Sequence, residues 1–342
     1  MKIVRGMPAA ALAACALAAL GIAPPAGAQP LPYTGVNLSG GEFGKSTPAK
    51  PAVYGRDYIF PSDKEMSYFA SKGVNIIRLP FRWETLQTAL SQPLDPGVLA
   101  KLQSVVADAN ADGMTVLLDP HDFARYYGQV IGGPDVSDAA FADFWSRLAS
   151  VFKDNPKVWF GLMNEPHDMS ARQWLSAANA AIAAIRQTGA RNMILVPGID
   201  WTGAHDWVSG ENGTVMLGVA DPDHHFLYEV HQYLDKDSSG TTAGVVSPTI
   251  GEQRLTAFTG WCRQHHARAF LGEFAAPATP GGDAAIQNML SYMEQNRDVW
   301  AGYTWWSAGP WWGHYMFSLE PKNGQDSPQM AYLAPHLQPA TR

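Results

Sequence analysis

The chain is 342 residues long, is 46% hydrophobic and carries a formal net charge of −7. Its length is enough to bury one large core without disulfides, and it has only two cysteines, Cys15 and Cys262. An acidic chain that lacks a run of basic residues is a poor partner for nucleic acid or for an acidic polymer, so we exclude both as ligands.

The first 28 residues have the pattern of a secretory signal peptide. A basic start with Lys2 and Arg5 precedes an apolar, alanine-rich run from residue 9 to residue 23, and Ala26-Gly27-Ala28 fits a cleavage site. The run is too short for a convincing membrane span. We therefore expect a mature chain of residues 29–342, free of the membrane, in the periplasm or outside the cell. Lipidation at Cys15 is the alternative, because residues 12–15 resemble a bacterial lipoprotein box.

Short apolar runs alternate with amphipathic segments along the mature chain. Eight runs predict strands, at residues 33–38, 74–80, 114–119, 158–163, 193–196, 226–231, 269–274 and 300–306. Helical patterns occupy residues 62–72, 95–112, 138–152, 170–188, 250–266 and 283–296, with a further helix possible near 327–337. Ser62 and Glu65 have the spacing of a capping box at the start of the first helix.

This alternation predicts an α/β protein with a parallel sheet. Eight repeats in about 310 residues favour a single-domain (β/α)8 barrel, the TIM barrel, over residues 29–342. A doubly wound open sheet is the alternative. The chain has neither of the glycine-rich nucleotide fingerprints that would support it.

Two of the predicted strands run into a glutamate. The apolar run at 158–163 is followed by Asn164-Glu165-Pro166, and the run from residue 269 reaches Glu273. Barrel enzymes carry their active sites at the carboxyl ends of the strands. Either glutamate alone has a simpler explanation as a solvated strand end, but the two together predict a pair of catalytic carboxylates, Glu165 and Glu273.

Other polar and aromatic residues fall at the same ends of the predicted strands or in the loops beyond them. The strand-end set consists of Arg78, His121, Asn164, His231, Tyr233 and Trp306. Four loop tryptophans, Trp201, Trp207, Trp311 and Trp312, lie in or beside stretches rich in glycine, proline and serine. A flat indole ring matches the apolar face of a sugar, so we expect these four to stack on substrate, although packing of loops on the barrel rim explains such residues too.

Metal ligation is a competing hypothesis for the histidines. The candidates are His224 and His225 with His231, or His265 with His266. Neither H-E-x-x-H nor a Cys/His ligand spacing is present, and the missing G-x-S-x-G disfavours a serine hydrolase. We therefore expect no metal and no cofactor.

Seven segments, in order along nearly the whole mature chain, resemble glycoside hydrolase family 5, and within it the secreted endo-β-1,4-glucanases (cellulases). These segments are 35–44 (GVNLSGGEFG), 76–81 (IIRLPF), 118–121 (LDPH), 162–166 (LMNEP), 229–233 (EVHQY), 271–274 (LGEF) and 305–312 (WWSAGPWW). The resemblance implies that Glu165 is the general acid/base and Glu273 the nucleophile. It also implies that the six strand-end residues complete the site, with the family's tryptophan at Trp306 rather than Trp305. Asp122 is a departure, because many relatives have asparagine there.

The resemblance further implies a retaining mechanism on a β-glucan polysaccharide or cello-oligosaccharide, without a cofactor, by a protein that we expect to be a monomer. Arg78 and the Tyr233 hydroxyl would hold Glu273 ionised, Glu165 would keep its proton, and Asn164 would donate to the sugar 2-hydroxyl. Two alternatives stay open. One is a related hydrolase of mannan, xyloglucan or β-1,3-glucan, and the other is a non-catalytic carbohydrate-binding protein, which would not need both glutamates.

Overall fold

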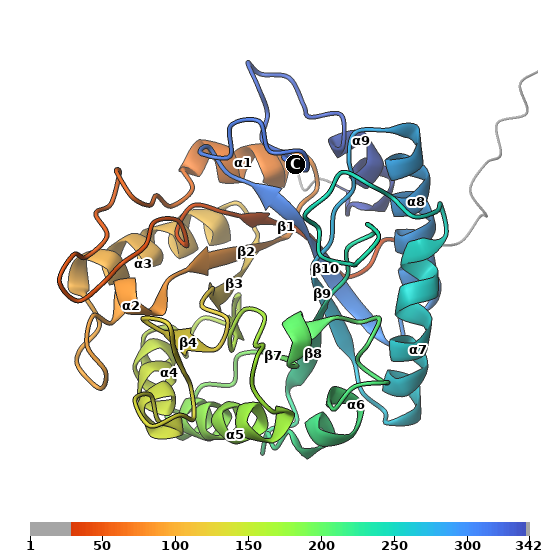
Figure 1. Cartoon of the computed structure of the whole chain (residues 1–342). Coiled ribbons are helices and arrows are strands. Elements are labelled where there is room, and N and C mark those ends of the chain that lie inside the picture. Colours follow the sequence, from red (N-terminus) through yellow and green to blue (C-terminus); the bar gives the residue numbers. More distant parts are fainter. Residues whose placement is uncertain (1–28, 340–342) are drawn as a thin grey trace, which may run out of the picture.

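The computed structural model describes residues 29–339, so the predicted signal peptide and Cys15 lie outside the described residues. Eight parallel strands close into a barrel in the order β1-β10-β9-β8-β7-β6-β3-β2 (Figure 1). They are β1 Tyr33–Leu38, β2 Ile76–Phe81, β3 Thr115–Pro120, β6 Val158–Gly161, β7 Ile194–Pro197, β8 Phe226–His231, β9 Ala269–Glu273 and β10 Trp300–Ala308. The predicted (β/α)8 barrel is confirmed.

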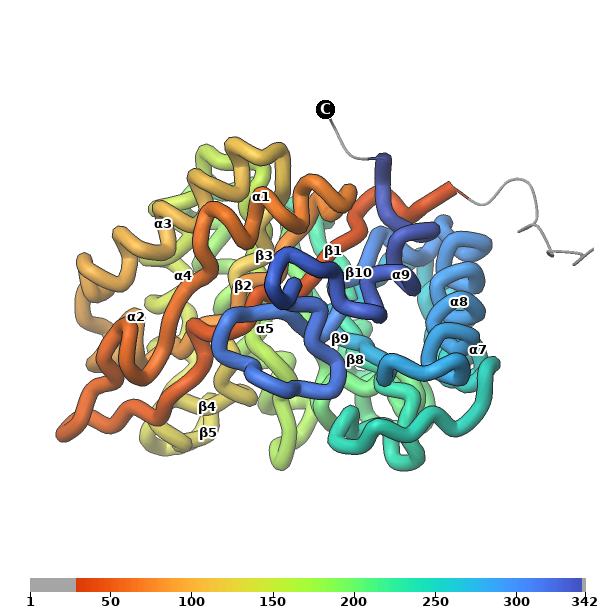
Figure 2. Tube along the Cα trace, turned by 90° about the horizontal axis from the view of Figure 1, so that it is seen from above, coloured from red at the N-terminus to blue at the C-terminus, as the bar shows by residue number. Residues whose placement is uncertain are grey.

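Helices surround the barrel and connect its strands (Figures 1 and 2). The long ones are α1 Asp63–Ser71, α3 Pro96–Ala111, α4 Asp138–Phe152, α5 Ala171–Gln187, α7 Ile250–Gln264 and α8 Pro280–Gln295. As predicted, Ser62 caps α1, since its hydroxyl accepts a hydrogen bond from the Glu65 N–H (3.3 Å). Within residues 29–339, no helix is both long enough and apolar enough to cross a membrane.

Several shorter elements were not expected from the sequence. They are α2 Trp83–Leu86, α6 Asn212–Val215, the hairpin β4 Arg125–Tyr126 and β5 Gln129–Val130, and the 3-10 turns η1 Asp200–Thr202 and η2 Met216–Gly218. The possible helix at 327–337 is wrong as one element. It is divided into α9 Met330–Leu333 and the 3-10 turn η3 Ala334–His336. Pro335 has no N–H and its ring crowds the preceding turn, so a regular α-helix does not continue through it.

The inside of the barrel is built in layers. Seven strands each contribute one apolar side chain to a cluster that is separate from the main core, namely Ile76, Leu117, Trp159, Leu195, Leu227, Phe270 and Ala301. Side chains alternate along a strand, so residues two positions further on share the same face. Those positions on β2, β3 and β8 hold Arg78, Asp119 and Glu229, which are all buried. An apolar plug therefore supports a charged layer, and the residues beyond that layer form the mouth.

Candidate active site

The two predicted catalytic glutamates meet at the mouth of the barrel. Glu273 is the last residue of β9, and Glu165 lies four residues beyond the end of β6, in a turn where its φ is 42°. Left-handed backbone is uncommon for a residue other than glycine and occurs often at functional sites. One carboxylate oxygen from each glutamate lies within 4.8 Å of the other and of a nitrogen of His231.

Glu273 is held by three hydrogen-bonding or charged neighbours. Its Oε1 accepts from Arg78 Nη1 (3.0 Å), its Oε2 accepts from the Tyr233 hydroxyl (2.7 Å), and His231 Nδ1 lies 3.6 Å from Oε2. Burial raises the pKa of Glu273, while the positive charges of His231 and Arg78 act to lower it. Burial and the neighbouring Glu273 raise the pKa of Tyr233 well above its usual value, so its hydroxyl remains a donor.

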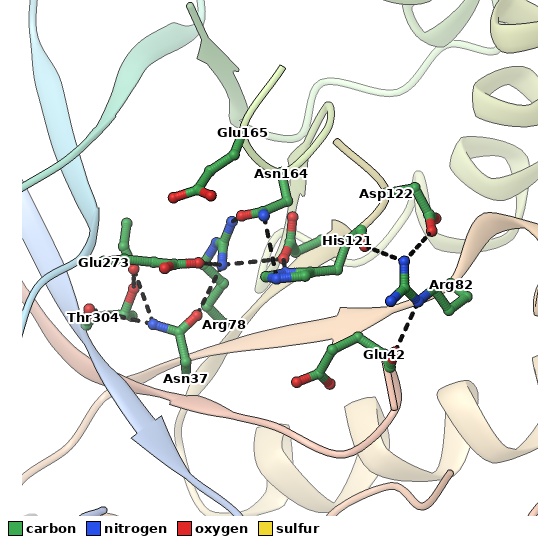
Figure 3. Close-up of polar contacts among 12 residues, drawn as sticks. Asn37, Glu42, Arg78, Arg82, His121, Asp122, Asn164, Glu165, Glu273 and Thr304 are labelled. Carbon is green, nitrogen blue, oxygen red and sulfur yellow. Dashed lines mark hydrogen bonds and ion pairs between the residues drawn. The ribbon is translucent and has the colours of Figure 1, made fainter. Parts of the chain in front are cut away.

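Arg78 organises the floor of the site (Figure 3). Its side chain is completely buried and forms ion pairs with Asp119 (3.1 Å), Glu229 (2.9 Å) and Glu273 (3.0 Å). Nη1 also donates to Asn37 Oδ1 at 3.0 Å. The prediction that Arg78 contacts the substrate is therefore wrong, because no part of it reaches the cleft; it acts on the sugar only through the groups that it holds.

A chain of hydrogen bonds fixes the orientation of Asn164 and the tautomer of His121 (Figure 3). Arg78 can only donate, so the Asn164 oxygen faces Arg78 Nη2 (2.8 Å) and the amide nitrogen faces His121 Nε2 (3.2 Å). His121 must accept at Nε2 and carry its proton on Nδ1, which donates to Asp119 Oδ2 (2.8 Å). Burial lowers the pKa of His121 to about 3, so the ring is neutral. One N–H of Asn164 is left for a ligand.

His231 joins the two glutamates. Its Nδ1 lies 2.7 Å from Glu165 Oε1. Burial lowers the pKa of His231, but Glu273, Glu165 and Glu229 together raise it to about 10, so the ring is an imidazolium at neutral pH. A fixed positive charge therefore lies between the two carboxyl groups.

Aromatic rings extend along the mouth on both sides of Glu165. Trp306 stacks on His121 with ring centres 5.1 Å apart, and Trp201 stacks on His167 at 4.6 Å. Phe123 touches both histidine rings and so connects the two stacks. Trp201 is 51% exposed and lines a cavity of about 530 Å³ together with Glu165. Stacked pairs in a cleft provide flat surfaces for ring-shaped ligands.

The loop that presents Trp201 is held firmly. Asp200, Trp201 and Thr202 all have φ between 54° and 57°, in the left-handed region. The Thr202 hydroxyl donates to the Glu229 carbonyl (2.6 Å), and the Trp201 N–H donates to the carbonyl of Pro166 (3.2 Å). The indole is therefore fixed relative to the turn that carries Glu165.

The other three loop tryptophans differ from Trp201. Trp207 is fully buried among Tyr228, Phe258 and Trp261, so the prediction that it stacks on sugar is wrong. Its loop folds back onto the outer core, which the glycine-rich sequence around it did not reveal. Trp312 is partly buried, stacks on Tyr315 (4.3 Å) and touches Trp306, while Trp311 is 39% exposed.

Of the two histidine sets weighed as metal sites, the one that joins His224 and His225 to His231 is not assembled. His224 and His225 precede β8, whereas His231 ends it, so the length of the strand, roughly 20 Å, separates them. His265 and His266 line a different hollow, with His224 and His225, at the opposite end of the barrel from Glu165. Within residues 29–339, the one group of three potential ligand residues with the spacing of a metal site is Glu165, His231 and Glu273.

Several residues of the site were not predicted as functional. Asn37 donates to three carbonyl oxygens, of Gly272, Thr304 and Trp305, and so ties β1 to β10 beside it and to β9 beyond. Asp119 and Glu229 each lie two positions before a predicted site histidine. The period of two along a strand, which already paired His231 with Tyr233, would have found them.

Comparison with known proteins places the chain among carbohydrate-active enzymes. The family described as Cellulase (glycosyl hydrolase family 5) matches residues 31–309. Endo-beta-1,4-glucanase B of Aspergillus niger is 42% identical over 293 residues, which are 85% of this chain and 86% of that protein. The structure of XacCel5A in complex with cellopentaose is 47% identical and superimposes with a TM-score of 0.87, covering 90% of this chain and 99% of the other. Pseudomonas stutzeri endoglucanase Cel5A in complex with cellobiose is 33% identical, with a TM-score of 0.83 and coverage of 92% and 97%.

Proposed function

Since this chain belongs to glycoside hydrolase family 5, we propose that it is an endo-β-1,4-glucanase that cleaves internal bonds of β-glucans with retention of configuration. The observation that carries this proposal is the separation of Glu165 and Glu273, whose nearest oxygens lie within 4.8 Å. Retaining glycosidases hold their two carboxyl groups about 5–5.5 Å apart, whereas inverting ones leave about 6.5–9.5 Å for a water molecule.

In the first step the Glu273 carboxylate attacks the anomeric carbon while Glu165 gives its proton to the departing glycosidic oxygen. Negative charge leaves Glu273 and arrives on Glu165. His231 Nδ1 lies 3.6 Å from Glu273 Oε2 and 2.7 Å from Glu165 Oε1, so the same cation faces the negative charge before and after its transfer. The free N–H of Asn164 is placed to donate to the sugar 2-hydroxyl, a contact that strengthens as the anomeric centre becomes positive.

In the second step Glu165 removes a proton from water, which attacks the anomeric carbon from the side of the departed sugar. Glu273 leaves as a carboxylate and recovers its contacts with Arg78 and Tyr233. Two inversions give net retention, so the first product is the β-anomer.

The aromatic mouth supports a polymeric β-1,4-glucan as substrate. Rings lie on both sides of Glu165, so the cleft has surfaces for sugars before and after the scissile bond. Relatives named endo-beta-1,4-glucanases and a structure named for its cellopentaose complex agree with a chain of several glucose units. We further propose that the enzyme acts as a monomer outside the cytoplasm, consistent with the signal pattern of residues 1–28 and with a polymer that cannot enter the cell.

The test is hydrolysis of a panel of polysaccharides by the purified mature protein. We expect release of reducing sugar to be fastest on soluble cellulose derivatives or mixed-linkage β-glucan, and slower on mannan, xyloglucan and β-1,3-glucan. Proton NMR of freshly cleaved cellopentaose should detect the β-anomer before mutarotation, and a strong chelator should leave the rate unchanged.

Other results would change the assignment. An α-anomer as first product would mean an inverting site and would remove the nucleophile role of Glu273. Loss of activity in chelator, with recovery on adding a divalent ion, would give Glu165, His231 and Glu273 a metal-binding role instead. Preference for another β-glycan would keep the mechanism and change the substrate, while no turnover of any glycan would favour a binding protein.

Trp201 and Trp207 form a matched pair of tryptophans for testing the sugar surface. We expect Trp201→Ala to raise KM for cellopentaose roughly five-fold, the loss of about 1 kcal/mol of stacking, with little change in Tm. Trp207→Ala should leave KM unchanged and cost about 3–5 kcal/mol of stability, since it empties part of the core. Kinetics and thermal unfolding of both variants check this, and an unchanged KM for Trp201→Ala would exclude a sugar contact there.

A further inference from the structure

A buried carboxylate lies directly beneath the catalytic pair. Glu229 belongs to β8, is 1% exposed and precedes His231 by two positions. Its Oε1 lies 2.9 Å from Arg78 Nε and 3.5 Å from His231 Nε2. Glu229 therefore contacts both cations of the floor from below, on the side away from the substrate.

Each cation has one nitrogen whose ion-pair partner is Glu229, namely Arg78 Nε and His231 Nε2. His231 uses Nδ1 for Glu165, and the terminal nitrogens of Arg78 already contact Asn37, Asn164 and Glu273. Within residues 29–339, neither Arg78 Nε nor His231 Nε2 has a well-aligned hydrogen bond. Glu229 therefore interacts with both nitrogens by charge attraction and not through directed hydrogen bonds. A neutral side chain of the same shape would therefore lose most of this interaction.

The neighbouring strand β9 leaves room for this carboxylate. A Cβ at Gly272 of β9 would overlap the Glu229 carboxylate and lie 2.8 Å from His231 Nε2. Any side chain at residue 272 would thus push Glu229 and His231 apart, which indicates that their close contact is a built feature of the barrel.

We infer that Glu229 is a positioning residue, the permanent counter-ion that keeps His231 doubly protonated throughout the catalytic cycle. The inference rests on the proposed retaining mechanism. In that cycle Glu165 is protonated when Glu273 is ionised, and Glu273 is esterified when Glu165 is ionised. Each catalytic carboxyl therefore loses its charge at one stage, whereas Glu229 touches no reacting atom and keeps its charge at every stage.

The groups around His231 explain why a permanent counter-ion is needed. Glu165 after β6, Glu273 of β9, Glu229 of β8 and Asp119 of β3 favour the charged ring, while burial and Arg78 of β2 oppose it. The Tyr233 hydroxyl also lies close, on Glu273. Burial acts to raise the pKa of Glu229, but Arg78 and His231 hold it below the usual value, so this carboxylate stays ionised.

The experiment measures the charge of His231 directly, by ¹⁵N NMR of histidine-labelled protein. In the wild type we expect both ring nitrogens of His231 to be protonated at pH 8, with the signal assigned through its absence in His231→Asn. In Glu229→Gln the ring should lose a proton at least about one pH unit lower. The pH profile of kcat/KM should move toward lower pH by a similar amount, because removing a negative charge makes each neighbouring group easier to deprotonate.

Glu294 offers a matched control outside the mouth. It is also buried and its Oε1 lies 2.8 Å from Nδ1 of His336, so Glu294→Gln also removes a carboxylate from a histidine pair. This variant is expected to leave the pH profile and the His231 signal unchanged. Glu229→Asp, which keeps the charge, should restore most of the wild-type profile.

Three outcomes would overturn the inference. One is a neutral His231 in the wild type at pH 8, a result that does not depend on whether Glu229→Gln folds. Another is an unchanged His231 titration in a folded Glu229→Gln protein, and the third is an equal shift in Glu294→Gln. Because the NMR measurement does not need turnover, an enzyme inactive on glucans would refute the proposed function without deciding the charge of His231.

Discussion

Replacing Glu273 by glutamine is expected to lower kcat on cellopentaose by roughly 10⁴–10⁶-fold, as loss of a nucleophile does elsewhere. The amide has nearly the same shape but cannot form the glycosyl-enzyme. Arg78 can still donate to the amide oxygen, and the Tyr233 hydroxyl can turn to accept from the amide nitrogen. Burial already raises the pKa of Glu273, so a neutral group is tolerated there and the fold should persist. Turnover of cellopentaose and thermal unfolding of the purified variant are the measurements.

A second variant identifies the role of Glu273 rather than its importance alone. In Glu273→Ala, added azide can occupy the vacated space and attack an activated β-glycoside from the face of the missing carboxylate, which yields an α-glycosyl azide. Recovery of activity with that product would assign the nucleophile. A Glu273→Gln protein that keeps more than a few per cent of wild-type turnover, after contamination is excluded, would show that another residue attacks the sugar.

Replacing Glu165 by glutamine should affect substrates according to their leaving groups. On cellopentaose, whose leaving sugar needs a proton, we expect a loss of about 10²–10⁴-fold. On a dinitrophenyl cellobioside the first step needs little acid, so the variant should show a rapid burst of phenol followed by slow release of sugar. The slow phase reflects the lost base of the second step, and stopped-flow absorbance resolves the two phases.

The leaving-group dependence separates an acid/base role from a positioning role. If Glu165→Gln were equally slow in the first step on both substrates, Glu165 would not be the proton donor. Azide should also rescue Glu165→Ala, but with formation of a β-glycosyl azide, since it then replaces water on the opposite face. The two alanine variants are thus controls for each other.

The sequence by itself determined the repeat of strands and helices and the presence of two glutamates at strand ends. A run such as 158–163 is too short and too apolar for an exposed element, so it predicts a buried parallel strand, and the alternation then predicts the barrel. Sequence patterns gave wrong predictions at two places. At 327–337 a helical pattern was present, but the proline interrupts the helix. At Trp207 the composition of the loop did not show that the indole packs into the core.

Only the tertiary structure decided that Glu273 faces the site. Phe270 lies in the inner cluster and Leu271 in the outer core, so strict alternation would turn Glu273 outward. The pairing of β8 and β9 shifts by one residue, from Val230 opposite Leu271 to His231 opposite Glu273, and Gly272 is left without its own partner. This bulge restores the inward direction of the carboxylate.

The charged floor also became visible only after the strands were placed side by side. Arg78, Asp119 and Glu229 come from three different strands and are separated by 41 and 110 positions along the chain. Each is a buried charge that would be costly alone, and no local pattern identifies its partner. Closure of the barrel brings them together, although Asp119 pairs with Pro80 and not with Arg78 in the β2–β3 register. The long Arg78 side chain spans this offset, and ion pairing compensates for the lost hydration.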